Sequence, residues 1–227
     1  MCGRYFWDDD AEEEFAVDFP RLAGEVRRIF ADGSSEIARD GARRIRSGDY
    51  TPAMQALAVA GGPAVAGVPF AAGGPAVADE PSLHAAFLRW GFPGFDKGKL
   101  LINARAESVK ERPTFAESFA LRRCVLPAAG FYEWDRKKEK VIFTAYGHKI
   151  LYLAGIYRPY GDENRFVVLT REANASMEPV HDRMPLILSK EEVAPWVCDA
   201  AEADGIMTKE LPQLQAVRPY EQMTFSW

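Results

Sequence analysis

Hydrophobic side chains recur along the chain in short runs whose period changes from helical to extended. Phe15 and Phe19 lie four residues apart in a segment that begins with three aspartates, which is typical of a helix with an acidic first turn. Pro20 ends that helix, and a later one starts after Ser189, a favourable N-cap residue. Further helices are expected at 114–121, 172–177 and 190–198, and short helical or irregular pieces at 21–30 and 36–46.

Extended segments account for most of the other apolar runs. Such runs, bounded by glycine, proline and asparagine, are typical of strands joined by turns. They are found at 83–90, 100–102, 124–127, 141–145, 150–156, 166–170 and 186–188. Because no linker divides the chain, we predict one α+β domain over 1–227, with a curved, barrel-like antiparallel sheet flanked by short helices.

The segment from Met54 to Ala78 is mostly alanine, valine, glycine and proline, and Gly-Gly-Pro-Ala-Val-Ala occurs in it twice, at 61–66 and 73–78. Its composition is similar to that of a membrane span. Prolines and glycines break it into pieces shorter than the roughly 20 residues that a spanning helix needs. We therefore expect strands and turns here, and no membrane partner.

Composition and charge narrow the class of protein further. Hydrophobic residues make up 48% of the chain and charged residues 27%, as in ordinary soluble globular proteins. A net charge of -5 argues against a protein that coats nucleic acid by bulk electrostatics, so such a partner would need a local basic groove. The acidic start of the chain argues against a signal peptide.

The three cysteines, Cys2, Cys124 and Cys198, are far apart and form no CxxC motif, so we predict neither a disulfide framework nor a metal site. This usage fits a reducing cytoplasm. Cys124 and Cys198 occur in apolar strand and helix contexts, where we expect inert packing residues.

Cys2 directly follows the initiator methionine. Removal of Met1 would give an N-terminal cysteine, whose amine titrates at about 7.7–8.0 and whose thiol titrates at about 8.5. Such an aminothiol can attack an acyl carbon through sulfur, or condense with an aldehyde through nitrogen and close a thiazolidine ring through sulfur. The alternative is that position 2 carries no information, because chain termini tolerate change.

Polar residues in apolar contexts are the other candidates for chemistry. Glu133 is flanked by aromatic residues, so its carboxylate either enters a partly desolvated pocket or lies on the wet face of an edge strand. Asn103 and Arg105 are two apart at a strand end and can face one ligand, or can belong to a solvated cluster with Glu107. His181 lies beside Asp182 in a loop, where it is either structural or catalytic.

Five motifs in this order resemble the SOS response-associated peptidase (SRAP) family over nearly the whole chain. They are Met1-Cys2-Gly3-Arg4, Trp90-Gly91, Ile102-Asn103-Ala104-Arg105-Ala106-Glu107, Gly130-Phe131-Tyr132-Glu133-Trp134 and His181-Asp182-Arg183-Met184-Pro185. The resemblance implies a sensor of abasic sites in single-stranded DNA that traps the deoxyribose aldehyde on Cys2 as a thiazolidine. It also implies autoproteolytic and abasic-site lyase activities.

The resemblance also implies roles for individual residues. His181 would donate a proton during sugar ring opening, Glu133 would shuttle protons at the amine, and Asn103 would hold the terminus and the sugar. Residues that would contact DNA are Arg4, Pro52, Trp90, Phe92, Arg105, Thr170 and Arg183, with the arginines on phosphates and Trp90 and Phe92 stacked on bases. We expect no cofactor and no metal, a cytoplasmic monomer associated with the nucleoid when bound to DNA, and the replication machinery as a further partner.

One position departs from the family. Asp49 stands where the family usually has asparagine, and its carboxylate would repel phosphate, which puts binding near Pro52 in question. Two other functions stay open. One is an N-terminal nucleophile thiol peptidase or amidohydrolase, and the other is a non-enzymatic single-strand-binding module in which Cys2 is incidental.

Overall fold

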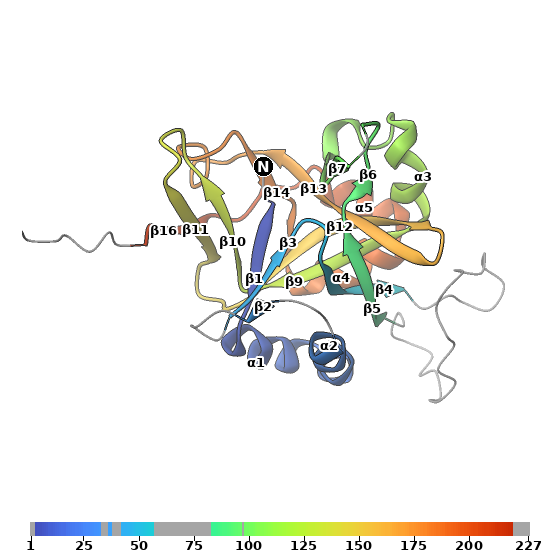
Figure 1. Ribbon diagram of the computed structural model, residues 1–227, viewed down its shortest axis with the longest axis horizontal. Coiled ribbons are helices and arrows are strands. Elements are labelled where there is room, and N and C mark those ends of the chain that lie inside the picture. Colours follow the sequence, from blue (N-terminus) through green and yellow to red (C-terminus); the bar gives the residue numbers. More distant parts are fainter. Residues whose placement is uncertain (1–2, 33–35, 38–41, 57–82, 97, 220–227) are drawn as a thin grey trace, which may run out of the picture.

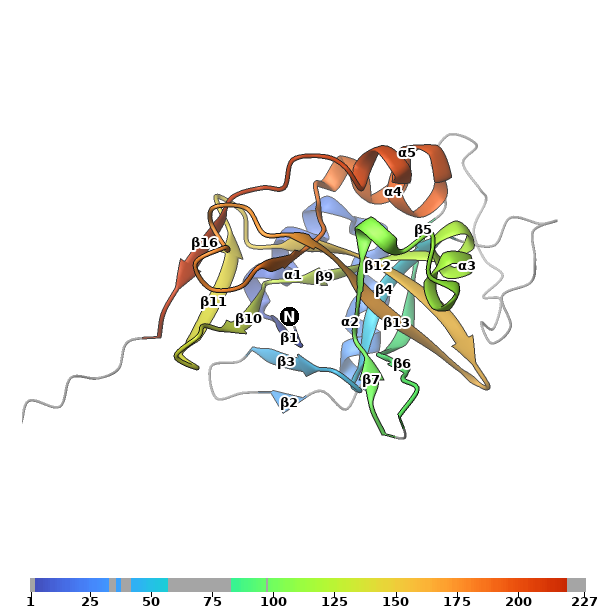
Figure 2. The ribbon, with the colours of Figure 1, turned by 90° about the horizontal axis from the view of Figure 1, so that it is seen from above.

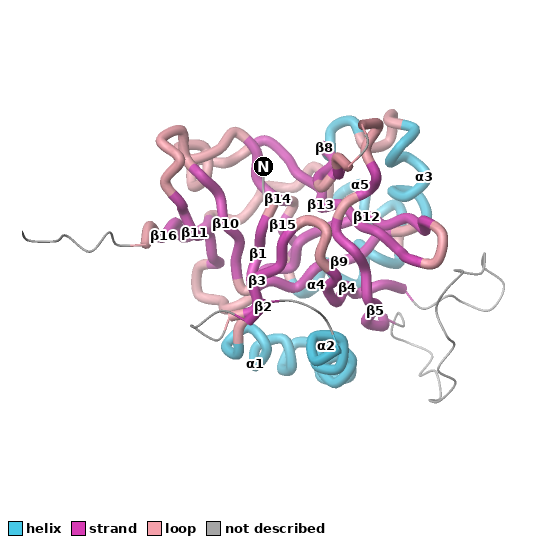
Figure 3. The backbone as a smooth tube through the Cα atoms, viewed as in Figure 1, coloured by secondary structure: helices cyan, strands magenta, loops and turns pink. Residues whose placement is uncertain are grey.

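A computed structural model describes residues 3–32, 36–37, 42–56, 83–96 and 98–219 (Figures 1 and 3). Cys2 and the repeated segments at 61–66 and 73–78 lie outside the described residues. The described part is a mixed α+β structure built on two main sheets, which confirms the predicted fold class.

The first sheet has six strands, all antiparallel, in the order β16-β11-β10-β1-β3-β2. Its strands are β1 (Arg4–Trp7), β2 (Glu36–Ile37), β3 (Arg43–Arg46), β10 (Gly130–Trp134), β11 (Lys140–Ala145) and β16 (Leu214–Val217). We call it sheet A. The N-terminal strand β1 therefore lies inside the sheet, between β10 and β3, and not at its edge.

The second sheet has eight strands, and five of them close on themselves because β12 pairs with both β9 and β13. We call it the barrel. Its strands are β4 (Tyr50–Ala56), β5 (Leu83–Trp90), β8 (Asn103–Arg105), β9 (Arg123–Ala128), β12 (Leu151–Tyr160), β13 (Glu163–Glu172), β14 (Arg183–Pro185) and β15 (Ile187–Leu188). The pairings of β13 with β5 and β8 are parallel and the others antiparallel. A separate two-stranded sheet joins β6 (Phe92–Pro93) to β7 (Leu100–Leu101).

Short helices flank both sheets (Figures 1 and 2). They are α1 (Asp9–Asp18), α2 (Pro20–Asp32), the 3-10 helix η1 (Ala106–Ser108), α3 (Pro113–Leu121), α4 (Lys190–Cys198) and α5 (Ala200–Ile206). Helix α4 begins as the sequence predicts, because Ser189 and Glu192 form a capping box that satisfies amides of its first turn. Pro20 ends α1 and also starts α2.

Two sequence predictions of helix are wrong. The segment at 36–46 contains strands β2 and β3, because β3 pairs along its whole length with β1 and buries Ile45 completely. The segment at 172–177 forms turns instead. There the Asn174 side chain accepts from Ser176 N at 3.1 Å and donates to the carbonyls of Leu211 and Pro212, at 3.1 and 2.9 Å. Tertiary pairing overrides local propensity in both cases.

One hydrophobic cluster fills the space between sheet A and the barrel and continues under the helices. Trp7, Trp90 and Trp196 are fully buried in it. The chain passes from the barrel into sheet A through Gly130, where a Cβ atom would lie 2.5 Å from the Phe143 carbonyl oxygen. Only glycine allows this close approach of backbones, which fixes the start of β10.

The two described cysteines differ from each other. Cys124 is buried in the barrel, and burial raises the pKa of its thiol, in agreement with the expected packing role. Cys198 ends α4 and is exposed, so the packing role expected for it is wrong.

Candidate functional site

Glu133 is a buried acid in the middle of sheet A. Its strand pairs with β1 on one side and β11 on the other, and the residue is 3% exposed. The wet-edge alternative from the sequence is therefore wrong. Residues directly opposite in a ladder share a face, so Glu133 faces the core together with Phe131 and Tyr5.

The register of β1 against β10 also places the N-terminus. Tyr5 pairs with Phe131, and the same ladder continued by two residues sets Gly3 opposite Glu133. In Figure 1 the first residues of β1 lie at the end of the molecule where β10 ends and where β14 lies. Cys2 itself is outside the described residues, so its contact with Glu133 stays a prediction.

Strand β1 is anchored near this end by hydrogen bonds to three other segments. The Tyr5 hydroxyl donates to Thr51 Oγ1 at 2.6 Å, and both residues are buried. The Gly3 carbonyl accepts from Ser47 N at 3.3 Å, and the Phe6 carbonyl accepts from Ala129 N at 2.8 Å. The sequence analysis missed this anchor, because nothing in the sequence links Tyr5 to a threonine 46 residues away.

Asn103 and Arg105 begin and end β8, which lies parallel to β13. Asn103 is half-buried and pairs with Val168, whereas Arg105 is exposed and pairs with Thr170. The residue before β8 is held by two donors, because its carbonyl accepts from Trp90 Nε1 at 2.9 Å and from the backbone N–H of Val168 at 3.1 Å. Asn103 therefore sits on a rigid segment.

Two polar groups lie within hydrogen-bond distance of one ring nitrogen of His181. Its Nδ1 accepts from the backbone N–H of Arg183 at 2.9 Å and lies 2.9 Å from Asp182 Oδ1. Nδ1 cannot make both hydrogen bonds in one protonation state, because it would have to accept from the amide and donate to the carboxylate. The amide always donates, so we assign the lone pair to Nδ1 and the proton to Nε2 in the neutral ring, whereas a protonated ring would turn its Nδ1–H to Asp182. The neutral ring thus presents a donor at Nε2.

Arg183 forms a fork with Glu107. Its Nη1 and Nη2 donate to the two carboxylate oxygens at 2.8 and 2.7 Å, and Nη2 also donates to the Thr170 carbonyl at 2.6 Å. The guanidinium lowers the pKa of the Glu107 carboxyl through these hydrogen bonds. Glu107, which the alternative interpretation placed in a solvated cluster with Arg105, forms its ion pair with Arg183.

Several expected DNA contacts are inside the protein. Trp90 and Phe92 are 0% exposed, Trp90 stacking on Phe166 and Phe92 packing on Phe115. In this structure neither ring offers a face to a base, so the stacking role expected for them is corrected to a packing role. Thr170, another of the expected DNA contacts, is 1% exposed.

Asp49, where the sequence departs from the asparagine usual in the family, makes a local hydrogen bond. Its Oδ2 accepts from the backbone N–H of Arg46 at 2.8 Å and so closes the turn that contains Gly48 at φ +94°. The carboxylate is used inside its own turn. Pro52 lies in β4 opposite Phe87, and its side chain is outside the described residues.

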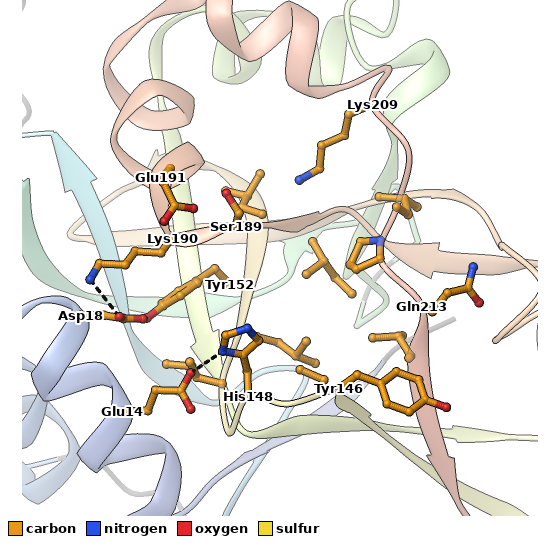
Figure 4. Close-up of a pocket in the computed structure, with 18 of the residues that line it drawn as sticks. Glu14, Asp18, Tyr146, His148, Tyr152, Ser189, Lys190, Glu191, Lys209 and Gln213 are labelled. Atoms are coloured by element: carbon orange, nitrogen blue, oxygen red, sulfur yellow. Dashed lines mark hydrogen bonds and ion pairs between the residues drawn. The ribbon is translucent and has the colours of Figure 1, made fainter.

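The structure also contains a cavity of about 800 Å³. It lies between the end of α1, the loop before β12, the start of α4 and the segment before β16 (Figure 4). Two pairs of its charged side chains are in contact, Lys190 with Asp18 at 3.0 Å and His148 with Glu14 at 3.0 Å. Asn103, Glu133 and His181 do not line it. Of the predicted catalytic residues that the structure describes, this cavity therefore holds none.

In the described part of the chain no group of three or more histidine, cysteine or acidic side chains is arranged to hold a metal ion. No helix of that part has the length and apolar character to cross a membrane.

Relatives with known names match the chain in part. The abasic site processing protein YoaM of Bacillus subtilis (strain 168) is 33% identical over 124 residues, which cover 48% of this chain and 55% of the relative. The abasic site processing protein YedK of Escherichia coli (strain K12) is 31% identical over 153 residues, which cover 64% of this chain and 67% of the relative. The chain thus spans about half the length of the first of these relatives.

Solved structures match over more of the chain. A crystal structure of a protein from Bacteroides thetaiotaomicron has a TM-score of 0.67 at 18% identity, covering 96% of this chain and 91% of the other. One from Bordetella bronchiseptica has a TM-score of 0.67 at 20% identity, covering 97% of this chain and all of the other. These likenesses show the fold.

The family model described as SOS response associated peptidase (SRAP) matches residues 1–227. The resemblance seen in the sequence motifs is therefore confirmed, and the chain belongs to the SRAP family.

Proposed function

We propose that this protein recognises abasic sites in single-stranded DNA and binds them covalently through Cys2 after removal of Met1. The observation that supports the proposal is the register of β1, which, continued by two residues, sets Gly3, the neighbour of Cys2, opposite the buried Glu133. The names of the relatives YoaM and YedK, both abasic site processing proteins, support the same substrate.

The covalent steps balance without a cofactor. The ring-opened abasic sugar presents an aldehyde, the Cys2 amine adds to its carbon, and one water leaves to give an imine. The thiol sulfur then adds to the same carbon, and its proton passes to nitrogen, which closes the thiazolidine. An imine without ring closure would instead allow strand cleavage by elimination, which is the lyase alternative.

Each remaining residue has a proposed role. His181 in its protonated form gives its Nε2 proton to the sugar ring oxygen during opening and keeps its Nδ1 proton directed at Asp182, so that a neutral ring remains. Glu133 moves protons at the amine, and Asn103 holds the terminus and the sugar by hydrogen bonds. Arg4 and Arg105 contact phosphates, whereas Arg183 orients His181, because three protein oxygens already accept from its guanidinium.

The test mixes purified protein with an oligonucleotide containing an abasic site and separates products on a denaturing gel after heating. The wild type is expected to give a heat-stable adduct. Cys2→Ser is expected to give an imine that borohydride traps and little adduct without reductant. A retained Met1 is expected to abolish both, because it blocks the amine.

Two results would overturn the proposal. A heat-stable adduct in the protein that retains Met1 would exclude the aminothiol mechanism. Binding of DNA by the wild type without formation of any adduct would favour the alternative function, a single-strand-binding module. Intact mass of the purified protein, measured first, establishes whether Met1 is absent.

The family description favours a second function, a peptidase in which Cys2 sulfur attacks an amide and its own amine is the base. Turnover of an amide substrate that is lost in Cys2→Ala would support it. Failure of the protein to remove its own Met1 or to cleave added peptides would count against this function.

A further inference from the structure

Trp90 touches both segments on which the proposed chemistry depends. Its indole N–H donates to the Ile102 carbonyl at 2.9 Å, and Ile102 is the residue before Asn103. Its ring centroid lies 5.4 Å from that of Tyr5, with 51° between the ring planes. Tyr5 belongs to β1 and follows Cys2 by three residues. One fully buried side chain therefore contacts both the N-terminal strand and the residue that leads into β8.

The backbone on either side of the Trp90 ring is held in place. The N–H of Trp90 donates to the Asp49 carbonyl at 2.9 Å, and its carbonyl accepts from Gly48 N at 2.8 Å. The next residue, Gly91, donates to the Phe166 carbonyl at 2.8 Å and has φ +107°, a conformation that favours glycine. The indole itself stacks on Phe166, with centroids 5.8 Å apart and 12° between the planes. Trp90 is thus a fixed point against which other segments are held.

Both contacts of the indole are supported from a second side. The Tyr5 hydroxyl donates to Thr51 Oγ1 at 2.6 Å, and the Ile102 carbonyl accepts a second hydrogen bond, from Val168 N, at 3.1 Å. A backbone carbonyl has two lone pairs, so loss of the indole N–H leaves this carbonyl with one donor. We therefore expect removal of the donor to shift the segment before β8 and not to unfold the protein.

We propose that Trp90 is a positioning residue, which sets the N-terminal aminothiol and Asn103 at the separation that reaction with the abasic aldehyde requires. Reacting groups must be held in a narrow range of distance and angle, and a displacement of about 1 Å can cost about 100-fold in rate. This inference rests on the proposed function, in which Cys2 supplies the amine and Asn103 holds the terminus and the sugar. Because Trp90 is 0% exposed, its role differs from the base stacking expected from the sequence.

The main variant is Trp90→Phe, which keeps an aromatic ring and removes the N–H donor. The rate of adduct formation is measured with a saturating oligonucleotide that contains an abasic site. Affinity is measured by fluorescence anisotropy on a tetrahydrofuran oligonucleotide, in which a tetrahydrofuran analogue replaces the abasic site. The analogue has no aldehyde and therefore reports binding without crosslinking. The rate is expected to fall about tenfold, and the affinity is expected to stay unchanged.

Trp196→Phe is the matched control. Trp196 is also fully buried, and its indole N–H donates to the Cys124 carbonyl at 3.0 Å. This hydrogen bond joins α4 to β9, neither of which carries a residue proposed for the chemistry. The control loses the same donor and the same ring volume, and we expect it to change neither rate nor affinity. Equal losses of rate in the two variants would overturn the inference, and so would a weaker affinity of Trp90→Phe with an unchanged rate.

A second measurement does not depend on the chemistry. Amide hydrogen exchange, followed by mass spectrometry, compares the peptides that contain β1 and β8 in the wild type and the variants. Trp90→Phe is expected to speed exchange in both peptides, because the smaller ring contacts Tyr5 less and no longer donates to the Ile102 carbonyl. Trp196→Phe is expected to speed exchange in peptides of α4 and β9 instead.

Unchanged exchange of either β1 or β8 in Trp90→Phe would overturn the inference, because Trp90 would then hold one segment at most. If the wild type forms no adduct with a true abasic site, the proposed chemistry fails. Hydrogen exchange then still decides whether Trp90 positions the two segments.

Discussion

Arg183 connects three parts of the candidate site through one side chain and its own backbone. Its guanidinium holds Glu107 and the Thr170 carbonyl, and its backbone N–H holds His181 Nδ1. The fork geometry is specific to arginine, because lysine presents a single charged point and cannot bind both carboxylate oxygens in one plane. Hydrogen bonds of Arg183 therefore link Glu107 to His181.

We predict that Glu107→Gln slows adduct formation and leaves DNA affinity unchanged. Without the charged fork, Arg183 is less firmly held, and the His181 ring that it contacts is less well oriented for proton donation from Nε2. The rate of adduct formation is therefore expected to fall by up to the roughly 100-fold that a general acid supplies. Rates of adduct formation at saturating DNA, with affinity for the tetrahydrofuran oligonucleotide, measure the two effects separately. Glu172→Gln, an exposed acid opposite Arg183 in the β13–β14 ladder, is the matched control. A weaker affinity with an unchanged rate would place Arg183 on phosphate.

The same pair predicts a pH dependence of stability. Arg183 lowers the pKa of Glu107 in the folded protein, so the pair stabilises the fold at pH values above the ordinary carboxyl pKa of about 4.3. That stability is lost as the pH falls through the lower, folded pKa. Wild type and Glu107→Gln are thus expected to differ in urea midpoint at neutral pH and to converge in acid. A constant difference across this range would assign the effect to packing.

At the scale of elements, Arg123 joins two helix ends to the barrel. This buried residue of β9 donates to the carbonyls of Phe119 and Ala120 at the end of α3, at 2.8 and 2.9 Å. It also donates to the carbonyls of Trp196 and Val197 at the end of α4, at 2.6 and 3.4 Å. One guanidinium therefore satisfies carbonyls that two helices leave open.

We predict that Arg123→Met lowers the free energy of unfolding by about 3 kcal/mol or more, because it leaves several buried carbonyls without donors. Arg123→Lys is expected to recover only part of this, since lysine reaches fewer carbonyls. Urea unfolding measures both. Adduct formation by the folded fraction is expected to stay intact, because no residue proposed for the chemistry contacts Arg123. A loss below about 1 kcal/mol would show that water replaces the guanidinium.

Element prediction from sequence succeeded where the signal is local. The Ser189 cap and the apolar runs at 124–127, 150–156 and 166–170 became α4, β9, β12 and β13, because capping and continuous apolar character need no distant partner. It failed for β3, whose arginine-rich sequence becomes a strand only by pairing with β1. It also failed for Trp90 and Phe92, because an aromatic motif does not reveal whether its rings face bases or the core.

At the scale of the molecule, the candidate site combines segments from both sheets. Glu133 and the N-terminal strand belong to sheet A, whereas Asn103 and Arg183 belong to strands that pair with β13 of the barrel. The motifs indicate which residues belong together, and the resemblance supplied their roles. The Tyr5–Thr51 bond and the Glu107–Arg183 fork required the structure, because each joins residues far apart in sequence.

This division of the site leads to a prediction about cooperativity. Sheet A and the barrel share one hydrophobic cluster, so we expect them to unfold together. Far-ultraviolet circular dichroism, tryptophan fluorescence and the capacity to form the heat-stable adduct should then be lost at the same urea concentration. Tyr5→Phe, which removes the donor to Thr51, should shift all three midpoints downward by the same amount. Loss of adduct formation at a lower urea concentration than the fluorescence change would show that sheet A opens while the barrel stays folded, and the chain would then contain two cooperative units.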